Sequence, residues 1–312
     1  MPLLRREKVL PLLIMPRHLT SGRGLAACGL LALAGIAVFS RIGAAQSQED
    51  CFPPKDSHEA HLFADLAVPL AFSTAEAPPQ IAPGAVRFGL EATYLPNIDA
   101  ETRTPTICRP GKGPENTDLL FAVPRPRVAV GLPAGFVLEG SWVPPVRLNG
   151  VKADLLGVSL ERSIPLGRAG SLLALRAHAA FGLIQAPVTC NDAALQDPNS
   201  ECFQGTRSDD RYHPNTFGAE GVVSWPLDGG RFRPFLGGGL NVLHPRFQVN
   251  FTNQFGFTDN RKVEVDLTRG AILAGATWAA VRGLAVTGEI YSSPSDAVTG
   301  RLVGSYAIRT GR

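Results

Sequence analysis

The stretch FGAEGVVSWPLDGGRFRPFLGGGLNV, residues 217–242, decides the fold. In its first half the apolar Phe217 and Val223 share one parity, and the acidic Glu220 has the other. A glycine-containing turn follows over 227–230, and the second half alternates again. Because side chains two residues apart lie on the same face of a strand, the stretch predicts two antiparallel strands joined by a tight turn.

Segments of this kind recur and predict about ten strands, within a range of roughly 8 to 12. They cover residues 85–95, 119–132, 136–143, 152–164, 171–184, 217–226, 231–242, 263–278, 284–290 and 298–308. In the second segment Pro124 and Pro126 predict a bulge or an irregular stretch, since proline donates no ladder hydrogen bond. In the eighth segment the apolar residues change from one face of the strand to the other near Arg269 and Gly270, which predicts a bulge there.

The lengths of the connections sort the strand ends into two groups. Tight turns fall at 133–135, 167–170, 228–230 and 282–283, and longer polar segments at 96–117, 187–215 and 256–261. All the tight turns lie on one side and all the long segments on the other, as periplasmic turns and extracellular loops do in outer-membrane barrels. We therefore expect both ends of the barrel in the periplasm.

The physics of lipid selects a closed arrangement for such strands. A lipid-facing backbone has no water to bond, so strands cross a membrane only in a ring without a free edge. Tyr94, Trp142, Trp225 and Trp278 lie near strand ends, where interfacial aromatic girdles occur. A soluble exported β-sandwich or closed barrel is the alternative, because the same alternation also suits a sandwich core.

With its amphipathic strand pairs and the glycine-rich strand 232–240, the region 85–309 resembles bacterial outer-membrane β-barrel proteins in general. The resemblance implies an all-β fold over 85–312: a single antiparallel, up-and-down transmembrane barrel. It also implies outer-membrane lipid and the barrel insertion machinery as partners.

The amino terminus carries a targeting pattern. Basic residues precede an apolar run over 25–39, and Gly43, Ala44 and Ala45 follow it. This order predicts a signal peptide over 1–45, and the run is short for a membrane span, although a retained anchor helix is the alternative. A start at Met15 would leave a signal of ordinary proportions. Export and a barrel together predict the outer membrane of a Gram-negative cell.

Removing the signal leaves Cys51, Cys108, Cys190 and Cys202. An even number of cysteines in an exported chain predicts disulfides. Cys190 and Cys202 bracket one polar segment and form the natural pair, whereas a Cys51–Cys108 pair depends on the path of the chain. No CxxC or HxxxH spacing accompanies the cysteines, so we expect no metal site.

Residues 46–84 differ in kind from the strands. Ser57 can cap a short helix over 58–68, and proline-rich chain follows. Two interpretations stay open: a periplasmic leader against the barrel mouth, or a plug inside the lumen. Pairing of Cys51 with Cys108, which lies in a predicted extracellular loop, would require the plug.

Twelve ionisable side chains have the parity of the lumen, and we call them the lumen network. They are Arg87, Glu91, Arg125, Arg127, Glu139, Glu161, Arg176, His178, Glu220, Arg233, Glu289 and Arg301. Mixed signs predict a cross-linked interior and no single-sign selectivity ring. A barrel of this strand number is close to the size that side chains fill, so we expect a narrow or closed lumen.

The composition excludes several functions. A formal net charge of +3 and the absence of a basic, aromatic-rich run argue against nucleic acid. No phosphate loop or nucleophile elbow indicates a cofactor or an enzyme. Asp209, Asp210 and His213 are the one grouping that could activate water, and solvated loop residues explain them better. The remaining classes are a porin-like channel or transporter for small molecules, apolar ones included, and a structural or interaction barrel with one long disulfide-bound loop.

Overall fold

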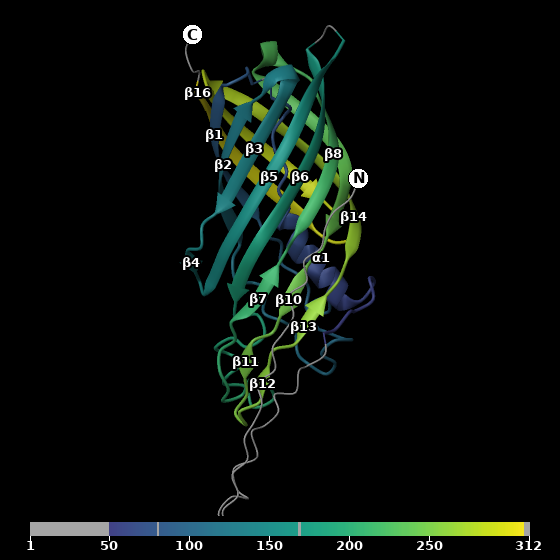
Figure 1. Ribbon diagram of the computed structural model, residues 1–312, viewed down its shortest axis with the longest axis vertical. Coiled ribbons are helices and arrows are strands. Elements are labelled where there is room, and N and C mark those ends of the chain that lie inside the picture. The colour runs from purple at the N-terminus through teal and green to yellow at the C-terminus, as the bar shows by residue number, and fades with distance from the viewer. Residues whose placement is uncertain (1–49, 80, 168–169, 309–312) are drawn as a thin grey trace, which may run out of the picture. The chain divides into compact units, whose positions relative to one another are not determined.

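The computed structural model describes residues 50–79, 81–167 and 170–308, which form one closed antiparallel barrel with an inner helix (Figure 1). The ring consists of β1 (Val86–Tyr94), β2 (Ala122–Gly131), β3 (Phe136–Val143), β5 (Val151–Leu166), β6 (Ser171–Ala186), β8 (Thr216–Ser224), β9 (Phe232–Leu243), β14 (Leu267–Val281), β15 (Leu284–Ser292) and β16 (Val298–Ile308). Each strand pairs with the next, and β1 also pairs with β16, so the ring has no free edge. The predicted ten-strand, up-and-down barrel is confirmed. The predicted signal peptide lies outside the described residues.

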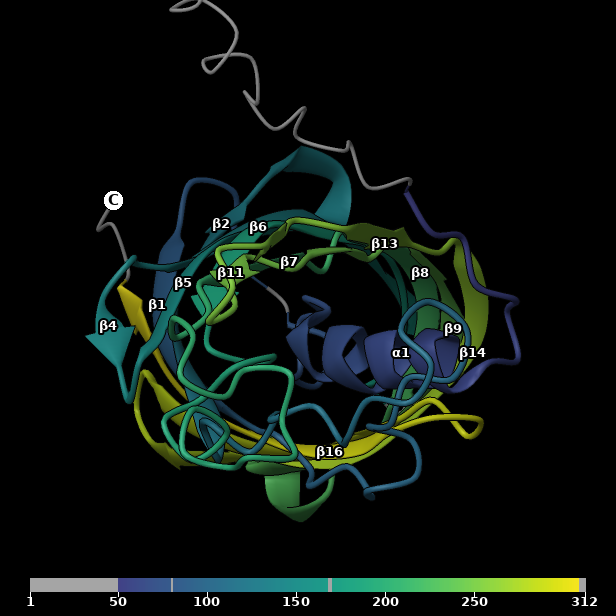
Figure 2. The same ribbon diagram turned by 90° about the horizontal axis from the view of Figure 1, so that it is seen from below.

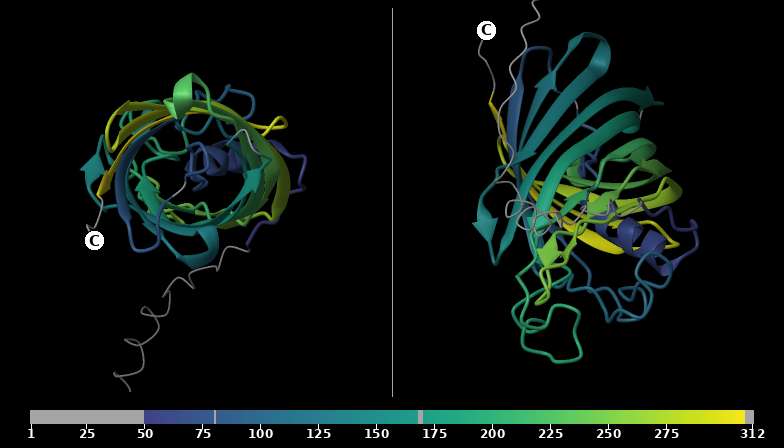
Figure 3. Two further views of the ribbon diagram at one scale, coloured as in Figure 1. Left: turned by 90° about the horizontal axis from the view of Figure 1, so that it is seen from above. Right: turned by 60° about the horizontal axis from the view of Figure 1, so that its bottom comes forward.

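The two ends of the barrel differ. The turn end carries the short 3-10 turns Pro133–Gly135 and Asp228–Gly230. The loop end carries the long connections and the short strands (Figure 3). These strands are β4 (Arg147–Leu148), β7 (Asp210–His213), β10 (Arg246–Gln248), β11 (Phe251–Thr252), β12 (Thr258–Asp259) and β13 (Lys262–Glu264). The pairing of β7 with β6, and of β10 with β7 and β13, extends the wall of the barrel beyond the ring.

The outer face of the barrel is apolar. Phe88 and Leu90 on β1 are 51% and 58% exposed, whereas Glu91 next to them is fully buried. The exposed aromatic side chains fall into two levels. Tyr94 and Trp142 lie near the loop end of their strands, and Trp225 and Trp278 lie toward the turn end. Two such levels flanking an apolar belt are the pattern of a barrel that sits in lipid.

One short helix, α1 (His58–Leu70), accompanies the strands. Within the described part of the chain, no helix is both long and apolar enough to span a membrane.

A bulge at Pro124 and Pro126 is absent from the pairing of β1 with β2, whereas the pairing of β2 with β3 leaves both prolines out. Pairing between β1 and β2 runs without a register shift, and Ala92 and Leu90 lie opposite the two prolines. Because the prolines share one parity, both lack an N–H on the same edge of the strand. The pairing of β2 with β3 begins at Arg127, after both prolines.

The parity shift predicted near Arg269 is wrong. The predicted strand 263–278 is split into β13 and β14, and β14 pairs with β9 in one register from Leu267 to Trp278. Leu267, Ala271 and Leu273 are buried apolar side chains of the inner face, on one parity across the predicted shift. A register shift occurs instead at Ala279–Val281, in the pairing with β15.

Candidate functional site

The amino-terminal segment occupies the lumen. We call residues 50–79 the plug segment. It begins at the loop end, where Cys51 bridges β13 through Cys51 N to Lys262 O at 2.8 Å and Glu264 N to Cys51 O at 3.0 Å. In the view along the barrel, α1 lies inside the ring (Figure 2). The sequence left two interpretations open, a periplasmic leader and a plug inside the lumen. The structure agrees with the plug, since the segment lies inside the barrel.

Local chemistry sets where α1 begins and ends. Ser57 Oγ accepts a hydrogen bond from Ala60 N at 3.2 Å, which satisfies one free N–H of the first turn. Pro69 occupies the last turn, and Ala71 is already non-helical. The prolines that follow prevent another helix, so the chain continues through the lumen in an irregular form with its carbonyls free for other donors.

Arginines from three strands bind those carbonyls. Arg127 Nη2 donates to the Ser73 and Thr74 carbonyl oxygens at 2.9 and 2.6 Å. Three more arginines act alike: Arg125 on Leu70 O at 3.0 Å, Arg301 on Ala71 O at 2.9 Å and Arg176 on Glu76 O at 2.5 Å. Carbonyls in the middle of a barrel have no backbone partner, and these guanidinium groups supply one.

Acidic side chains neutralise the arginines. The shortest pairs are Arg127 with Glu91 at 2.5 Å and with Glu139 at 2.8 Å, Arg176 with Glu161 at 2.6 Å, and Arg301 with Glu289 at 3.2 Å. His178 Nε2 lies 3.4 Å from Glu220 Oε1, and both side chains are buried. Such buried pairs add little net stability, but breaking one leaves an unpaired buried charge. The lumen network therefore fixes the position of the plug segment.

Two members of the lumen network sit differently. Arg87 is half-buried and pairs with Glu76 of the plug segment at 2.7 Å. Arg233 is half-buried, and its buried Nη1 has no hydrogen-bond partner in the described part of the chain. The remaining ten are buried: Arg125 binds the Leu70 carbonyl oxygen, and the other nine form the pairs described above. Sequence reasoning missed Glu76, because it lies in the proline-rich stretch, where no periodic pattern assigns a face.

A cavity of about 120 Å³ lies between α1 and the barrel wall at the loop end. Its lining is mostly apolar. The helix contributes Leu62, Phe63, Leu66 and Leu70, the strands contribute Val123, Leu155 and Ile184, and the loops contribute Leu119, Leu120 and Val188. We call this space the apolar cavity. Its polar lining residues include Glu115, Thr117 and Asp210.

A folded loop structure closes the loop end and ties it to α1. Cys51 forms a disulfide with Cys108, across 57 residues. Beside it, Glu59 accepts hydrogen bonds from the backbone N–H groups of Ile107 and Cys108 at 2.7 and 2.9 Å. Burial opposes ionisation of Glu59, but the backbone donors outweigh it and hold the pKa of this carboxyl below its usual value.

An ionic cluster continues the loop structure. Arg109 lies 3.2 Å from Glu115, 2.5 Å from Glu201 and 3.4 Å from Asp259. Lys112 adds a second cation, 2.7 Å from Glu115. Burial raises the pKa of Glu115, while Lys112 and Arg109 act in the opposite direction.

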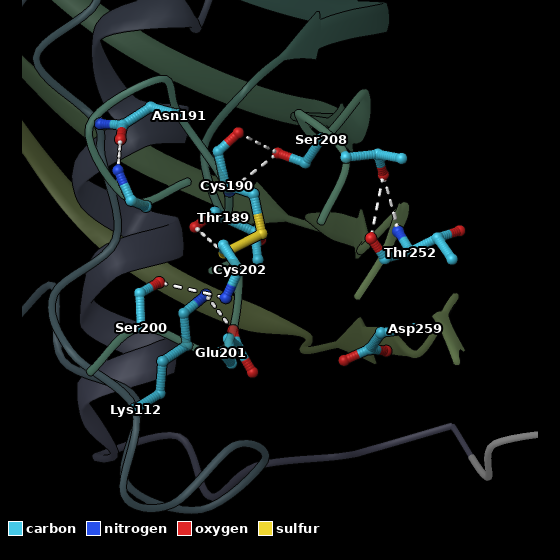
Figure 4. Close-up of a disulfide and its surroundings, with 12 residues drawn as sticks. Lys112, Thr189, Cys190, Asn191, Ser200, Glu201, Cys202, Ser208, Thr252 and Asp259 are labelled. Atoms are coloured by element: carbon cyan, nitrogen blue, oxygen red, sulfur yellow. Dashed lines mark hydrogen bonds and ion pairs between the residues drawn. A yellow bond between two sulfur atoms is a disulfide. The ribbon is translucent and has the colours of Figure 1, made fainter. Parts of the chain in front are cut away.

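The second disulfide joins Cys190 to Cys202 within one loop (Figure 4). Cys190 N donates to Ser208 Oγ at 2.9 Å, and Ser208 N donates to Cys190 O at 3.0 Å. Glu201, next to Cys202, joins this loop to the ionic cluster, because its Oε1 lies 3.3 Å from Lys112 Nζ. The disulfide-bound loop is thus attached to the ionic cluster, whose Glu115 lines the apolar cavity.

The grouping Asp209, Asp210 and His213 does not form a reactive centre. Asp210 accepts hydrogen bonds from Thr189 N at 2.7 Å, Ser208 Oγ at 2.8 Å and Asn250 N at 2.9 Å, which occupy both of its oxygens. His213 Nδ1 lies 2.8 Å from Gly182 O. These contacts hold β7 and its loops in place.

The closed ring, the apolar outer belt and the buried, plugged interior give this protein the architecture of the outer-membrane β-barrels. No protein-family model and no curated protein matches the chain.

Several solved structures of outer-membrane proteins are similar to this chain at low identity and low TM-score. Ail of Yersinia pestis, in complex with the heparin analogue sucrose octasulfate, is 10% identical, with 73% of this chain and all of Ail covered and a TM-score of 0.26. Omp33 of Acinetobacter baumannii is 7% identical, with 72% and 98% covered and a TM-score of 0.27. A porin of Rhodopseudomonas blastica is 10% identical over the same shares, with a TM-score of 0.19. These values are too low to indicate what this chain binds.

Proposed function

We propose that this protein is an exported outer-membrane barrel that binds a small apolar molecule in the apolar cavity and keeps its lumen closed with its own plug segment. The long loops face outward, and the turn end faces the periplasm. The apolar cavity carries the proposal, because it is the place where an apolar molecule fits against both the plug segment and the wall. Insertion would use the barrel insertion machinery, as for other barrels of this class.

The size and lining of the cavity support a ligand of about one aromatic ring. An apolar cavity of roughly 150 Å³ lined by Leu, Ile and Phe stays dry and takes up benzene. The apolar cavity has about 120 Å³ and a wall of the same residue types. A sugar or an ion would lose its hydration there without enough polar partners in return.

The lumen beyond the cavity argues for a gated route over an open pore. Four buried arginines bind plug carbonyls between Leu70 and Glu76, so a solute can pass only after these bonds are released. A small-molecule transporter would therefore move the plug segment during passage. A static binding barrel would never do so.

A binding measurement tests the proposal. Purified protein in micelles, titrated with toluene and followed by calorimetry against empty micelles, should bind one molecule per chain. Leu66→Trp fills the cavity from the helix side and should abolish the binding, and Leu138→Trp on the lipid-facing surface is the matched control. Equal heats from the wild type, both variants and empty micelles would contradict the proposal.

The second candidate is an interaction barrel. The loop between Cys190 and Cys202 is braced by its disulfide, and most of its residues are exposed. A rigid, solvated loop can present a surface to a partner outside the cell. The toluene titration separates the two candidates, because an interaction barrel without a cavity ligand would give no heat beyond that of empty micelles.

A further inference from the structure

Two buried polar atoms on residues that line the apolar cavity have no hydrogen-bond partner among the residues that the structure describes. They are Glu115 Oε2 and Thr117 Oγ1. Glu115 as a whole is 5% exposed. A buried polar atom without a partner is unfavourable and uncommon in native proteins.

The other oxygen of Glu115 is well satisfied, so the carboxylate is held in place with one side free. Glu115 Oε1 accepts from Lys112 Nζ at 2.7 Å and from Arg109 Nη1 at 3.2 Å. The backbone is held too, because Glu115 N donates to Arg103 O and Asn116 N donates to Val188 O, both at 2.9 Å. Rearrangement of this segment to satisfy Oε2 would break these bonds.

We infer that the molecule bound in the apolar cavity carries a neutral hydroxyl on its small apolar body, with phenol as the simplest example. The inference rests on the proposed function and names the ligand of the same cavity. The hydroxyl donates to Glu115 Oε2 and accepts from Thr117 Oγ1, while the ring contacts the leucines of α1. No covalent step is involved.

A neutral donor fits better than an ammonium group. Arg109 and Lys112 already oppose the charge of Glu115, so a third cation would be repelled by both. The rest of the lining is mostly apolar and would not solvate a charged head group.

Phenol and toluene make the test, since a hydroxyl and a methyl group are close in size. Both are titrated into the full-length protein in micelles, with Leu66→Trp subtracted as the background of each. The readout is the affinity ratio of phenol to toluene, which cancels the different hydration of the two probes when variants are compared. Thr117→Val removes the hydroxyl at constant shape and should lower this ratio about 10-fold, the range expected for one buried hydrogen bond. Glu115→Gln removes the charged acceptor and should also lower this ratio.

The outcomes separate the two levels of the claim. If toluene binds and the ratio is unchanged in Thr117→Val, the ligand needs no hydroxyl and this inference fails while the proposed function stands. If benzylammonium binds more tightly than phenol, the inference also fails, because a charged donor is then preferred. If neither probe binds above the Leu66→Trp background, the proposed function itself fails and the inference with it.

Discussion

Arg127 Nη1 lies 2.5 Å from Glu91 Oε2, and both side chains are buried inside the barrel. The same guanidinium binds Glu139 and the carbonyls of Ser73 and Thr74. One side chain thus joins the wall of the barrel to the plug segment. Its removal affects both at once.

Arg127→Met keeps most of the volume and removes the charge. Glu91 and Glu139 then lose a buried cation, and we expect the free energy of unfolding to fall by about 3 to 5 kcal/mol, the cost of breaking a buried pair. Urea titration in micelles measures it. Arg233→Met is the matched control, since Arg233 Nη1 has no hydrogen-bond partner, and its effect should be less than about 1 kcal/mol. Similar losses in the two variants would show that Arg127 has no special role.

Gly157 should admit no larger side chain, because it faces the plug segment. A Cβ at this position would lie 2.4 Å from Ser141 Oγ, a hydroxyl that can rotate away, and 2.6 Å from Phe72 Cγ, whereas a Cβ at Gly221 meets no described atom within 4 Å. We expect Gly157→Val to displace Phe72 and expose the plug segment to protease, and Gly221→Val to have no effect. Phe72→Ala added to Gly157→Val should restore resistance, and failure to do so would mean that the clash is elsewhere.

The two disulfides should differ in their effect on the plug segment. Cys51–Cys108 closes 57 residues and Cys190–Cys202 closes 12. Loop-closure entropy gives roughly 4 and roughly 3 kcal/mol of stabilisation for the two. Replacing the first pair by serine should speed hydrogen exchange in α1. Replacing the second should leave α1 unchanged and affect its own loop. Faster exchange of α1 in the second variant alone would contradict this assignment.

Docking of α1 should weaken as the pH rises. Burial, and then the nearby Asp296, raise the pKa of Asp65 to about 7, with Asp99 acting in the same direction and His61 and Arg269 opposing. The folded state therefore holds a proton that the unfolded chain loses near its ordinary value of 3.8. Stability from this group is full below that value and is lost as the pH rises toward about 7.

Hydrogen exchange of α1 at pH 5 and pH 8, corrected for the intrinsic rate, measures the effect. Protection should be lower at pH 8 in the wild type and nearly equal at both pH values in Asp65→Asn. Asp266→Asn, at an exposed site of the loop end, is the control and should keep the wild-type difference. An unchanged difference in Asp65→Asn would assign the pH dependence to another group.

Most of the fold could be predicted from the alternation of apolar and polar residues along each strand. The places where this pattern failed have physical causes. The ten strands followed from alternation because one face meets lipid and the other a polar lumen, as Leu90 and Glu91 illustrate. Alternation misled at β14, where Leu267 and Leu273 face inward and pack within the same buried apolar cluster as α1. A polar lumen was the assumption, and the plug segment makes part of that lumen apolar.

The apolar cavity could not be predicted from the sequence. Its lining comes from α1, from the ends of several strands and from loops near Leu119 and Val188, which are far apart in the chain and share no pattern. The contact of Glu59 with Cys108 likewise joins two segments that no local signal relates. By contrast, the members of the lumen network could be named in advance, because strand parity alone decides whether a side chain points inward.

The central claim is that the chain crosses the membrane as a barrel and that its plug segment enters from the outer end. Short epitopes placed before Cys51, within the loop at Asn199 and in the turn at Gly229 test it by antibody labelling of intact and permeabilised cells. We expect the first two epitopes to be labelled on intact cells and the third only after permeabilisation. Labelling of the Asn199 epitope alone on intact cells, with the epitope before Cys51 shielded, would contradict the threaded path and the closed lumen that depends on it.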